Sequence, residues 1–313
     1  MSSDAHVPVL LGPVLDGLKI KPGGCYVDGT FGRGGHSGEI LKQLNANGRL
    51  IAIDRDPQAI AAAPEVLRSD PRFELIKGEI AELATHIRER EFIGKVDGLL
   101  LDLGVSSPQL DEAERGFSFL RDGPLDMRMD PHSGVSAQKW LETVEEIELR
   151  RVIKTFGEER QAARIARAVV ATREKTPILR TAALAAIVAQ AIPAVRFKKG
   201  PRKHPATKTF QAIRIAVNAE LDQLEAALAQ SIELLTMGGR LCVISFHSLE
   251  DRIVKRFVRN ASREPDQYRG MPKIPEEFLP PLKTINKAIS ATAEEIAANA
   301  RARSARLRIA ERL

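Results

Sequence analysis

The sequence predicts an α/β fold in which a Rossmann-like parallel sheet is interrupted by an inserted all-helical domain. Three observations carry this prediction. Short apolar runs alternate with helical patterns over the first hundred residues, as in a parallel sheet with helical crossovers. The alternation stops after Leu103 and is followed by two helical patterns with no strand between them. The apolar run 241–246 then resumes the sheet.

The expected elements of the first part follow one another along the chain. Apolar residues at helical spacing cover 9–18, and Pro22 with two glycines ends that helix. Strands are expected at 25–28, 50–54, 73–76 and 96–103, with helices at 36–44 and near 58–67. The run Leu99-Leu100-Leu101 marks the fourth strand as covered on both faces.

The later elements define the insertion. Residues 106–135 contain many Gly, Pro, Ser and Asp residues, which is typical of an irregular surface segment. Helical patterns are expected at 136–172 and 181–192. Apolar steps of three and four residues from Phe210 to Leu235 predict one long helix, and the alternation at 305–309 predicts an antiparallel edge strand. The expected boundaries are 1–109 for the first part of the sheet domain, 110–209 for the helical domain with a basic loop, and 210–313 for the second part.

Composition narrows the class of protein. The chain has 313 residues, of which 43% are hydrophobic and 28% charged, which is too apolar for wholesale disorder. Its two cysteines, Cys25 and Cys242, lie too far apart in sequence for a disulfide framework or a cysteine zinc site. The longest apolar run, 182–191, is shorter than the ~20 residues that span a bilayer, and residues 1–15 show no signal peptide. We therefore expect a cytoplasmic protein without a membrane partner.

Charge is distributed unevenly along the chain. Residues 1–112 contain 12 basic and 17 acidic side chains, whereas residues 113–313 contain 35 and 24. The segment 196–208 has six basic residues and no acidic one. This pattern favours a polyanionic partner for the later part of the chain, and solvated helix faces are the alternative.

A glycine-rich turn follows the first strand, with the sequence Asp28-Gly29-Thr30-Phe31-Gly32-Arg33-Gly34-Gly35-His36. In the dinucleotide-binding fingerprint a third glycine would stand where this chain has Ser37, and this difference disfavours a nicotinamide dehydrogenase. The turn also lacks the Gly-Lys-Ser/Thr sequence of a P-loop. It is closer to the Asp-x-Gly-x-Gly-x-Gly pattern of S-adenosylmethionine (SAM) sites.

Acidic residues end two later strands. Asp54 closes the second strand, where a carboxylate can accept hydrogen bonds from both ribose hydroxyls of an adenosine ligand. In the alternative reading, Asp54 caps the next helix and the glycines only turn the chain. Asp102 ends the fourth strand and is either part of the same crevice or a turn residue. The segment 245–248 reaches the same edge, and we read its His247 as structural.

Longer blocks carry a family resemblance. They are HVPVLL from His6, YVDGTFGRGGHS from Tyr26, IAIDRDPQAI from Ile51, LLLDLGVSSPQLDEAERGFSF from Leu99, DGPLDMRMD from Asp122, GEERQAARIARA from Gly157, HPATKTFQAIRIAVNAEL from His204, GGRLCVISFHSLEDRIVKRF from Gly238 and RARSARLRIAER from Arg301. With them the chain closely resembles the bacterial 16S rRNA (cytosine-N4)-methyltransferase family, known as RsmH or MraW. The blocks span nearly the whole chain and are least dense over 261–291.

The resemblance implies a SAM-dependent methyltransferase that modifies the exocyclic N4 of one cytidine in the decoding (P-site) region of 16S rRNA, in the small ribosomal subunit. Carried onto this chain, the implied SAM contacts are Gly34, Gly35, His36, Asp54, Ile80, Asp102 and Gln109. The chain departs from its relatives at Ile80, where they often have an aromatic residue; a branched aliphatic side chain can still pack on adenine.

The implied reaction sets demands on the protein. The donor is an activated sulfonium, so the reaction needs neither a covalent enzyme intermediate nor a metal. The protein must align nitrogen, methyl carbon and sulfur and accept a hydrogen bond from the amine as positive charge develops there. The catalytic candidates are Asp102, Ser106 and Pro108, because the segment 106–109 partly resembles the Asp/Asn/Ser-Pro-Pro-aromatic loop of other amino-methyltransferases. Which group accepts this bond, a backbone carbonyl, Ser106 or Asp102, is left open.

Basic residues are the expected phosphate contacts, and these contacts would position RNA without reading its sequence. They are Lys198, Lys199, Arg202, Lys203, Lys208, Arg301, Arg303 and Arg306. A solvated loop is the alternative for the first cluster. Two other functions stay open: methylation of an amino group on DNA or protein, and a binding module that holds SAM only as a structural ligand. The oligomeric state is also open, and a homodimer is compatible with the sequence.

Overall fold

The structure, a computed structural model, describes residues 8–192, 204–264, 266–268, 274–275 and 278–313. The chain divides into two units, the first made of Met1–Gly104 and Leu221–Leu313 and the second of Val105–Glu220. The junctions therefore fall at 104/105 and 220/221, against the sequence-based positions 109/110 and 209/210. No helix among the described residues has the length and apolar character needed to cross a bilayer.

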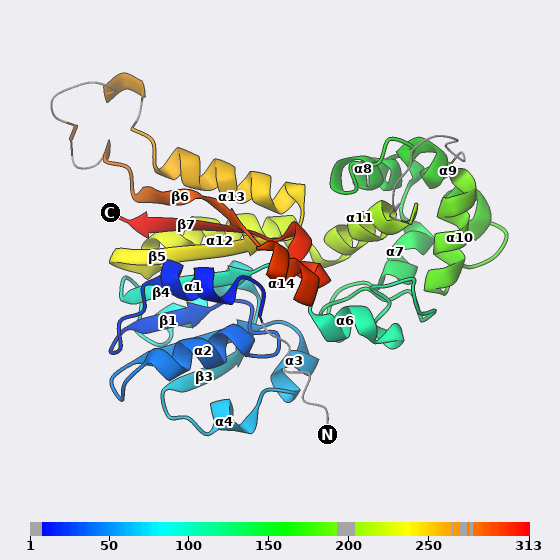
Figure 1. The fold of residues 1–313 in the computed structure, drawn as a ribbon. Coiled ribbons are helices and arrows are strands. Elements are labelled where there is room, and N and C mark those ends of the chain that lie inside the picture. Colours follow the sequence, from blue (N-terminus) through cyan, green and yellow to red (C-terminus); the bar gives the residue numbers. More distant parts are fainter. Residues whose placement is uncertain (1–7, 193–203, 265, 269–273, 276–277) are drawn as a thin grey trace. The chain divides into compact units, whose positions relative to one another are not determined.

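A seven-stranded sheet forms the framework of the first unit, in the order β3-β2-β1-β4-β5-β7-β6 (Figure 1). The strands are β1 Cys25–Asp28, β2 Arg49–Asp54, β3 Phe73–Lys77, β4 Val96–Asp102, β5 Leu235–Ser245, β6 Leu282–Ser290 and β7 Arg306–Arg312. From β3 to β5 all neighbours are parallel, and β7 runs antiparallel to both β5 and β6. The predicted Rossmann-like sheet is thus confirmed.

Helices cover both faces of this sheet because side chains alternate between the faces along each strand. Val27 and Leu99 lie in one apolar cluster with residues of α5, α12 and α13. Tyr26 and Leu100 lie in the opposite cluster with residues of α1 and α2 (Figure 1). The helices and short turns of this unit are α1 Leu11–Leu18, α2 Gly35–Gln43, α3 Pro57–Ala61, α4 Glu65–Arg68, η1 Ile80–Glu82, α5 Leu83–Arg88, α12 Glu220–Leu234, α13 Ser248–Ala261, η3 Asp266–Tyr268, α14 Ala293–Ala298 and η5 Ala300–Ser304.

The second unit is helical among its described residues. Its elements are α6 Ser107–Asp111, η2 Ala113–Arg115, α7 Ala137–Thr143, α8 Glu146–Phe156, α9 Ala162–Arg173, α10 Thr181–Ala191 and α11 Thr207–Asn218. One apolar core joins them, with Leu149, Ile165 and Ile213 fully buried at its centre. Because α11 contributes to this core, it belongs with the insertion.

Three sequence predictions were wrong in detail. The helix expected near 58–67 is two short helices, because Pro64 interrupts the hydrogen-bond ladder between them. The long helix expected over 210–235 is broken at Ala219, whose φ of 48° is left-handed. The strand expected at 305–309 is antiparallel as predicted, but it lies inside the sheet; the edge strand is β6.

Candidate cofactor site at the carboxyl edge of the sheet

Three neighbouring parallel strands end in aspartates. Asp28, Asp54 and Asp102 are the last residues of β1, β2 and β4. Because parallel strands end at the same edge, these side chains gather there. The strand order reverses between β1 and β4, and open α/β sheets bind ligands at such a switch point.

The glycine-rich turn has a backbone that other residues cannot adopt easily. Gly34 precedes α2 with a φ of 75°, and a methyl group added to it would lie 2.8 Å from ring atoms of Phe31 and 2.9 Å from Leu67 Cδ1. A methyl group on Gly35 would lie 2.5 Å from Pro8 Cγ. Both positions therefore favour glycine. The turn leads directly into α2, whose first N–H groups have no partner within the helix and can donate to an anionic group.

Hydrogen bonds tie this turn to two strands. The Gly32 N–H donates to Asp54 Oδ2 at 2.7 Å, and the Asp56 N–H donates to Asp54 Oδ1 at 2.8 Å. The Asp102 N–H donates to Thr30 Oγ1 at 2.6 Å. Each Asp54 oxygen has a second lone pair, so this carboxylate can still accept from a ligand. Burial raises its pKa to about 6.

The structure also tests whether Asp54 caps the helix that follows β2, which was the alternative to a role in ligand binding. The helix that follows β2 is capped by Asp56, whose side chain accepts from the Gln58 N–H at 2.9 Å. Capping that helix is therefore not the role of Asp54. Its oxygens hold the glycine-rich turn instead.

Asp28 is a further member of the cluster that the sequence analysis left out of the site. Its side chain is 1% exposed, accepts from Ser37 Oγ at 2.7 Å and accepts from the Thr30 N–H at 3.1 Å. Burial raises its pKa despite these bonds. The signal that could have found it is its position at a strand end, which it shares with Asp54 and Asp102.

Asp102 carries the clearest unsatisfied group of the site. Its Oδ1 atom is buried and has no hydrogen-bond partner among the described residues. Burial first, and then the negative charges of Asp28 and Glu250, raise its pKa to about 8. A buried carboxyl oxygen without a partner marks a place where a ligand can donate a hydrogen bond.

His36 faces Asp102 from the start of α2. Its Nε2 atom lies 3.1 Å from the Val9 carbonyl oxygen, which can only accept, so Nε2 carries the hydrogen. Its Nδ1 atom therefore has a lone pair and lies 3.6 Å from Asp102 Oδ2. Burial lowers the pKa of His36 to about 4, so the ring is neutral at physiological pH.

Ile80 lies beside the first glycine of the turn. It opens η1 after β3, and a methyl group added to Gly29 would lie 3.5 Å from Ile80 Cγ2. Its side chain is half-buried. Ile80 thus offers an apolar wall next to the end of β1.

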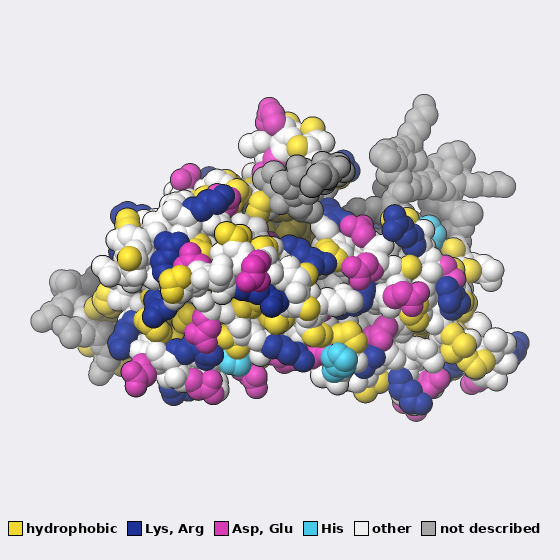
Figure 2. Space-filling view, turned by 90° about the horizontal axis from the view of Figure 1, so that it is seen from below, with side chains coloured by type: hydrophobic (Ala, Val, Ile, Leu, Met, Phe, Trp, Pro, Cys, Tyr) yellow, Lys and Arg dark blue, Asp and Glu magenta, His cyan; other side chains and the backbone are white. Residues whose placement is uncertain are grey.

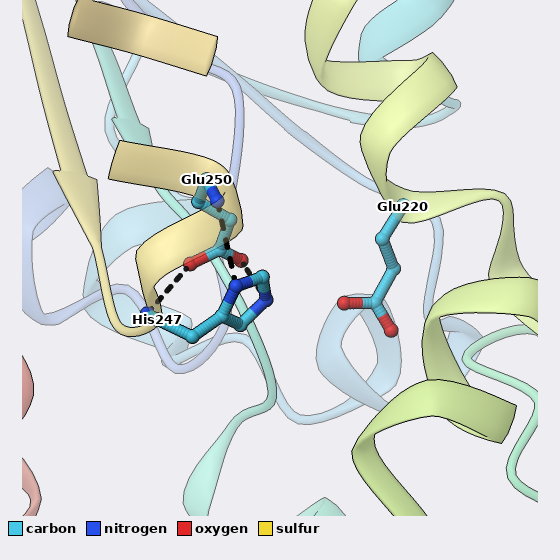
Figure 3. Close-up of side chains that lie close together, drawn as sticks. All are labelled: Glu220, His247 and Glu250. Atoms are coloured by element: carbon cyan, nitrogen blue, oxygen red, sulfur yellow. Dashed lines mark hydrogen bonds and ion pairs between the residues drawn. The ribbon is translucent and has the colours of Figure 1, made fainter. Parts of the chain in front are cut away.

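The segment after β5 reaches the same edge and starts α13. Glu250 is 2% exposed, and its Oε2 accepts from the Phe246 N–H at 2.8 Å. The same oxygen accepts from the His247 N–H at 3.2 Å (Figure 3). His247 Nδ1 accepts from the Glu250 N–H at 3.4 Å, which completes a capping box. His247 therefore caps α13, and its purely structural role stays a prediction. Glu220, also drawn in Figure 3, belongs to the second unit and binds Arg214 there, with two N···O distances of 2.8 Å.

The second unit contains the remaining expected site residues. Ser106 precedes α6, and its N–H donates to Gln109 Oε1 at 2.9 Å in a capping box. Pro108 lies in the first turn of α6, and Gln109 is 5% exposed. Their contacts are those of a helix start. The structure thus gathers Gly34, Gly35, His36, Asp54, Ile80 and Asp102 at one edge of the first unit, and the roles of Ser106, Pro108 and Gln109 stay predictions.

Four of the eight expected RNA contacts lie among the described residues, and one of these, Arg306, is exposed on β7. Lys198, Lys199, Arg202 and Lys203 lie outside the described residues. Lys208 is exposed and donates from Nζ to the Glu158 carbonyl at 2.9 Å. On η5, Arg303 is exposed and Arg301 is half-buried.

Comparisons with known proteins identify a family. A sequence model described as the MraW methylase family matches residues 3–313. A Clostridium thermocellum protein, described provisionally as an rRNA methylase, is 13% identical, with 98% of this chain and 100% of that chain covered and a TM-score of 0.45. An rRNA methylase from Streptococcus thermophilus is 11% identical, with coverages of 98% and 99% and a TM-score of 0.43. The assignment that follows rests on the family match.

Proposed function

Because the chain belongs to the MraW methylase family, we propose that it transfers a methyl group from SAM to the exocyclic N4 of a specific cytidine in the decoding region of 16S rRNA, within the small ribosomal subunit. The chain is a SAM-dependent methyltransferase. The nucleic-acid target is the part that we propose. The observation that carries it is the family match over residues 3–313.

The chemistry of the carboxyl edge supports SAM as the ligand. SAM has two cationic groups, two ribose hydroxyls, an apolar adenine and a carboxylate. Asp28, Asp54 and Asp102 supply negative charge and hydrogen-bond acceptors, and the start of α2 supplies donors. A cation beside Asp102 favours its ionised form and lowers its raised pKa. Ile80 would pack against the adenine.

In this reaction the chain's own residues must orient the cytosine amine and accept its proton. Bound SAM supplies a methyl group on a sulfonium. As the nitrogen–carbon bond forms and the carbon–sulfur bond breaks, the cytosine amine must lose a proton. Asp102 is our first candidate for the proton acceptor, because a bound cation favours its ionised form and an ionised carboxylate can accept the proton. The Ser106 side chain and the backbone near Pro108 are the other candidates, and orientation of the amine would contribute most of the rate.

The RNA would be held by basic side chains. The expected phosphate contacts are Lys198, Lys199, Arg202, Lys203, Lys208, Arg301 and Arg303. Such contacts make binding fall steeply with salt. We place the reaction in the cytoplasm, where ribosomal subunits are assembled.

The test is transfer of labelled methyl from SAM to small subunits that lack the modification, with naked 16S rRNA and duplex DNA in parallel. Nucleoside analysis should find N4-methylated cytidine in the subunits. Label in DNA alone would instead indicate a different amino-methyltransferase. SAM binding without transfer to any substrate would indicate a binding module.

A further inference from the structure

A groove with a volume of about 930 Å³ lies between α13 and the strand pair β6–β7 in the first unit. Figure 1 shows α13 running along these strands, with which it is in contact. The charged side chains that line the groove are Lys255, Arg259, Arg263, Lys287, Arg306, Arg308 and Glu264. Six of these seven are basic, so we name it the basic groove.

Most of this positive charge is not neutralised within the protein. Lys255, Arg259, Lys287 and Arg306 are exposed, and none forms an ion pair with another described residue. Arg308 differs, because its guanidinium binds both oxygens of Asp251 at 2.8 and 3.1 Å. The basic groove therefore presents at least four side chains that can bind an anionic partner.

Several cations elsewhere in the first unit form ion pairs. Near the β3 edge, Arg72 binds Asp70 at 2.6 Å and Arg90 binds Glu74 at 2.7 Å. On the face drawn in Figure 2, Lys and Arg side chains are interspersed with Asp and Glu. The basic groove differs from these regions because it brings together four exposed cations that have no ion-pair partner among the described residues.

The fold explains why these cations share one surface. Val254 and Val258 of α13 are buried in the apolar cluster beneath the helix. Lys255 and Arg259 are four residues apart, so they lie on one face of α13, about 6 Å apart along its axis. The antiparallel strands supply Lys287 and Arg306 from the other side.

We infer that the basic groove binds the phosphate backbone of RNA outside the methylated nucleotide. This inference rests on the proposed rRNA substrate. None of the described residues that line the groove is aromatic, so they offer unpaired bases no stacking surface. It does offer the donors that bind phosphate oxygens, since Ser262, Thr284 and Asn286 lie among the cations. The groove would thus position a structured substrate without reading its sequence.

A membrane fits this surface less well. Peripheral membrane binding combines basic side chains with an exposed apolar face that enters the lipid. Of the apolar residues in the lining, Val258 and Ile309 are buried, and Pro280 and Ala288 are half-buried rather than exposed. The basic side chains line a concave surface. We therefore commit to RNA and use lipid vesicles as a comparison in the test.

The test uses two charge-matched variants of the full chain. The groove variant combines Lys255→Gln, Arg259→Gln and Lys287→Gln. The control variant combines Lys42→Gln, Arg88→Gln and Lys95→Gln, which are exposed and lie on α2, on α5 and just before β4. Binding to unmodified small subunits is measured from low to high salt, together with methyl transfer and SAM affinity.

We expect the groove variant to lose about 2 to 3 from the slope of log affinity against log salt, because each phosphate contact contributes about 0.7 to 0.9. Its KM for subunits should rise at least tenfold, with kcat and SAM affinity unchanged. The control variant should keep the wild-type slope. Equal slopes for both variants would overturn the inference.

The other outcomes separate this inference from the proposed function. If the wild-type protein binds subunits through the groove but never methylates them, the proposed function is wrong and the inference about the groove is still supported. If the groove variant instead loses binding to phosphatidylglycerol vesicles and keeps its subunit binding, the groove is a lipid surface and the inference is wrong.

Discussion

The Nδ1 atom of His36 lies 3.6 Å from Oδ2 of Asp102, and the two residues have opposite pKa shifts. Burial lowers the pKa of His36 to about 4 and raises that of Asp102 to about 8. At neutral pH the histidine is therefore neutral and the aspartic acid keeps its proton in the absence of a cationic ligand. The pair is poised to gain a negative charge when such a ligand arrives.

Asp102 should make the ligand-free protein less stable as pH rises. Its folded pKa of about 8 exceeds the ordinary value of 3.8, so the folded state binds the proton more tightly and stability is lost between about pH 4 and pH 8. Asp102→Asn removes this loss. Denaturant unfolding without SAM should show the variant more stable than wild type by on the order of a few kcal/mol at pH 8, with a smaller difference at pH 5.

The control for this experiment is Asp16→Asn, at an exposed aspartate of α1. It should change the free energy of unfolding little at any pH. A stability difference for Asp102→Asn that stays constant from pH 5 to pH 8 would contradict the assigned pKa.

SAM affinity should increase with pH between about 6 and 8, because the cationic ligand binds the ionised form of Asp102 and that form becomes more populated. Binding near pH 7 should release protons, measurable by calorimetry in buffers with different ionisation enthalpies. Asp102→Asn should bind SAM about 10- to 100-fold more weakly and release fewer protons. The SAM amine also titrates in this range, so the comparison with the variant isolates the contribution of Asp102. Equal proton release by both proteins would contradict the prediction.

Gly34→Ala should damage both the fold and SAM binding. A left-handed φ of 75° and a contact of 2.8 Å with the Phe31 ring predict a loss of about 1 to 3 kcal/mol in unfolding free energy. SAM affinity should fall at least tenfold, measured by calorimetry. Gly38→Ala in α2 is the matched control, because its nearest neighbour would be Leu67 Cδ2 at 4.0 Å. That variant should gain about 0.5 to 1 kcal/mol and bind SAM normally.

Glu250 should influence the site through its charge. Glu250→Gln keeps an oxygen that can accept from the Phe246 N–H and removes one of the two carboxylates that raise the pKa of Asp102. The pH midpoint of SAM affinity should therefore shift downward. Glu250→Ala would also leave buried N–H groups without a partner and should cost about 1 to 3 kcal/mol of stability. An unchanged midpoint in Glu250→Gln would show that its charge does not reach Asp102.

The edge that carries the proposed site could be predicted from the sequence, because it follows from a general property of parallel sheets. Asp54 and Asp102 each end an apolar run, and the carboxyl ends of such runs meet. The electrostatics of the site could not be predicted. The neutral state of His36 depends on burial, and its tautomer depends on the Val9 carbonyl, 27 residues away in sequence. The unpartnered Oδ1 of Asp102 likewise depends on how distant segments pack.

Two parts of the fold were missed for physical reasons. The edge strand Leu282–Ser290 buries only Leu282 fully, so its side chains show no clear two-residue period. The break at Ala219 is hidden because the apolar spacing continues through it. Residues of α11 pack in the core of the second unit, whereas those of α12 pack under the sheet, and hydrophobic periodicity does not distinguish two different cores.

The pairing of β4 with β5 has a consequence for folding kinetics. Leu99 pairs with Leu241, so the strands meet across the whole of Val105–Glu220. During synthesis β4 is made before its partner and exposes an apolar edge that can associate with other chains. Early folding of the inserted unit would shorten the loop that this pairing must close and reduce its entropic cost. The inserted unit would then speed this long-range pairing of its host sheet, and replacing it with a long flexible linker should slow refolding and increase aggregation.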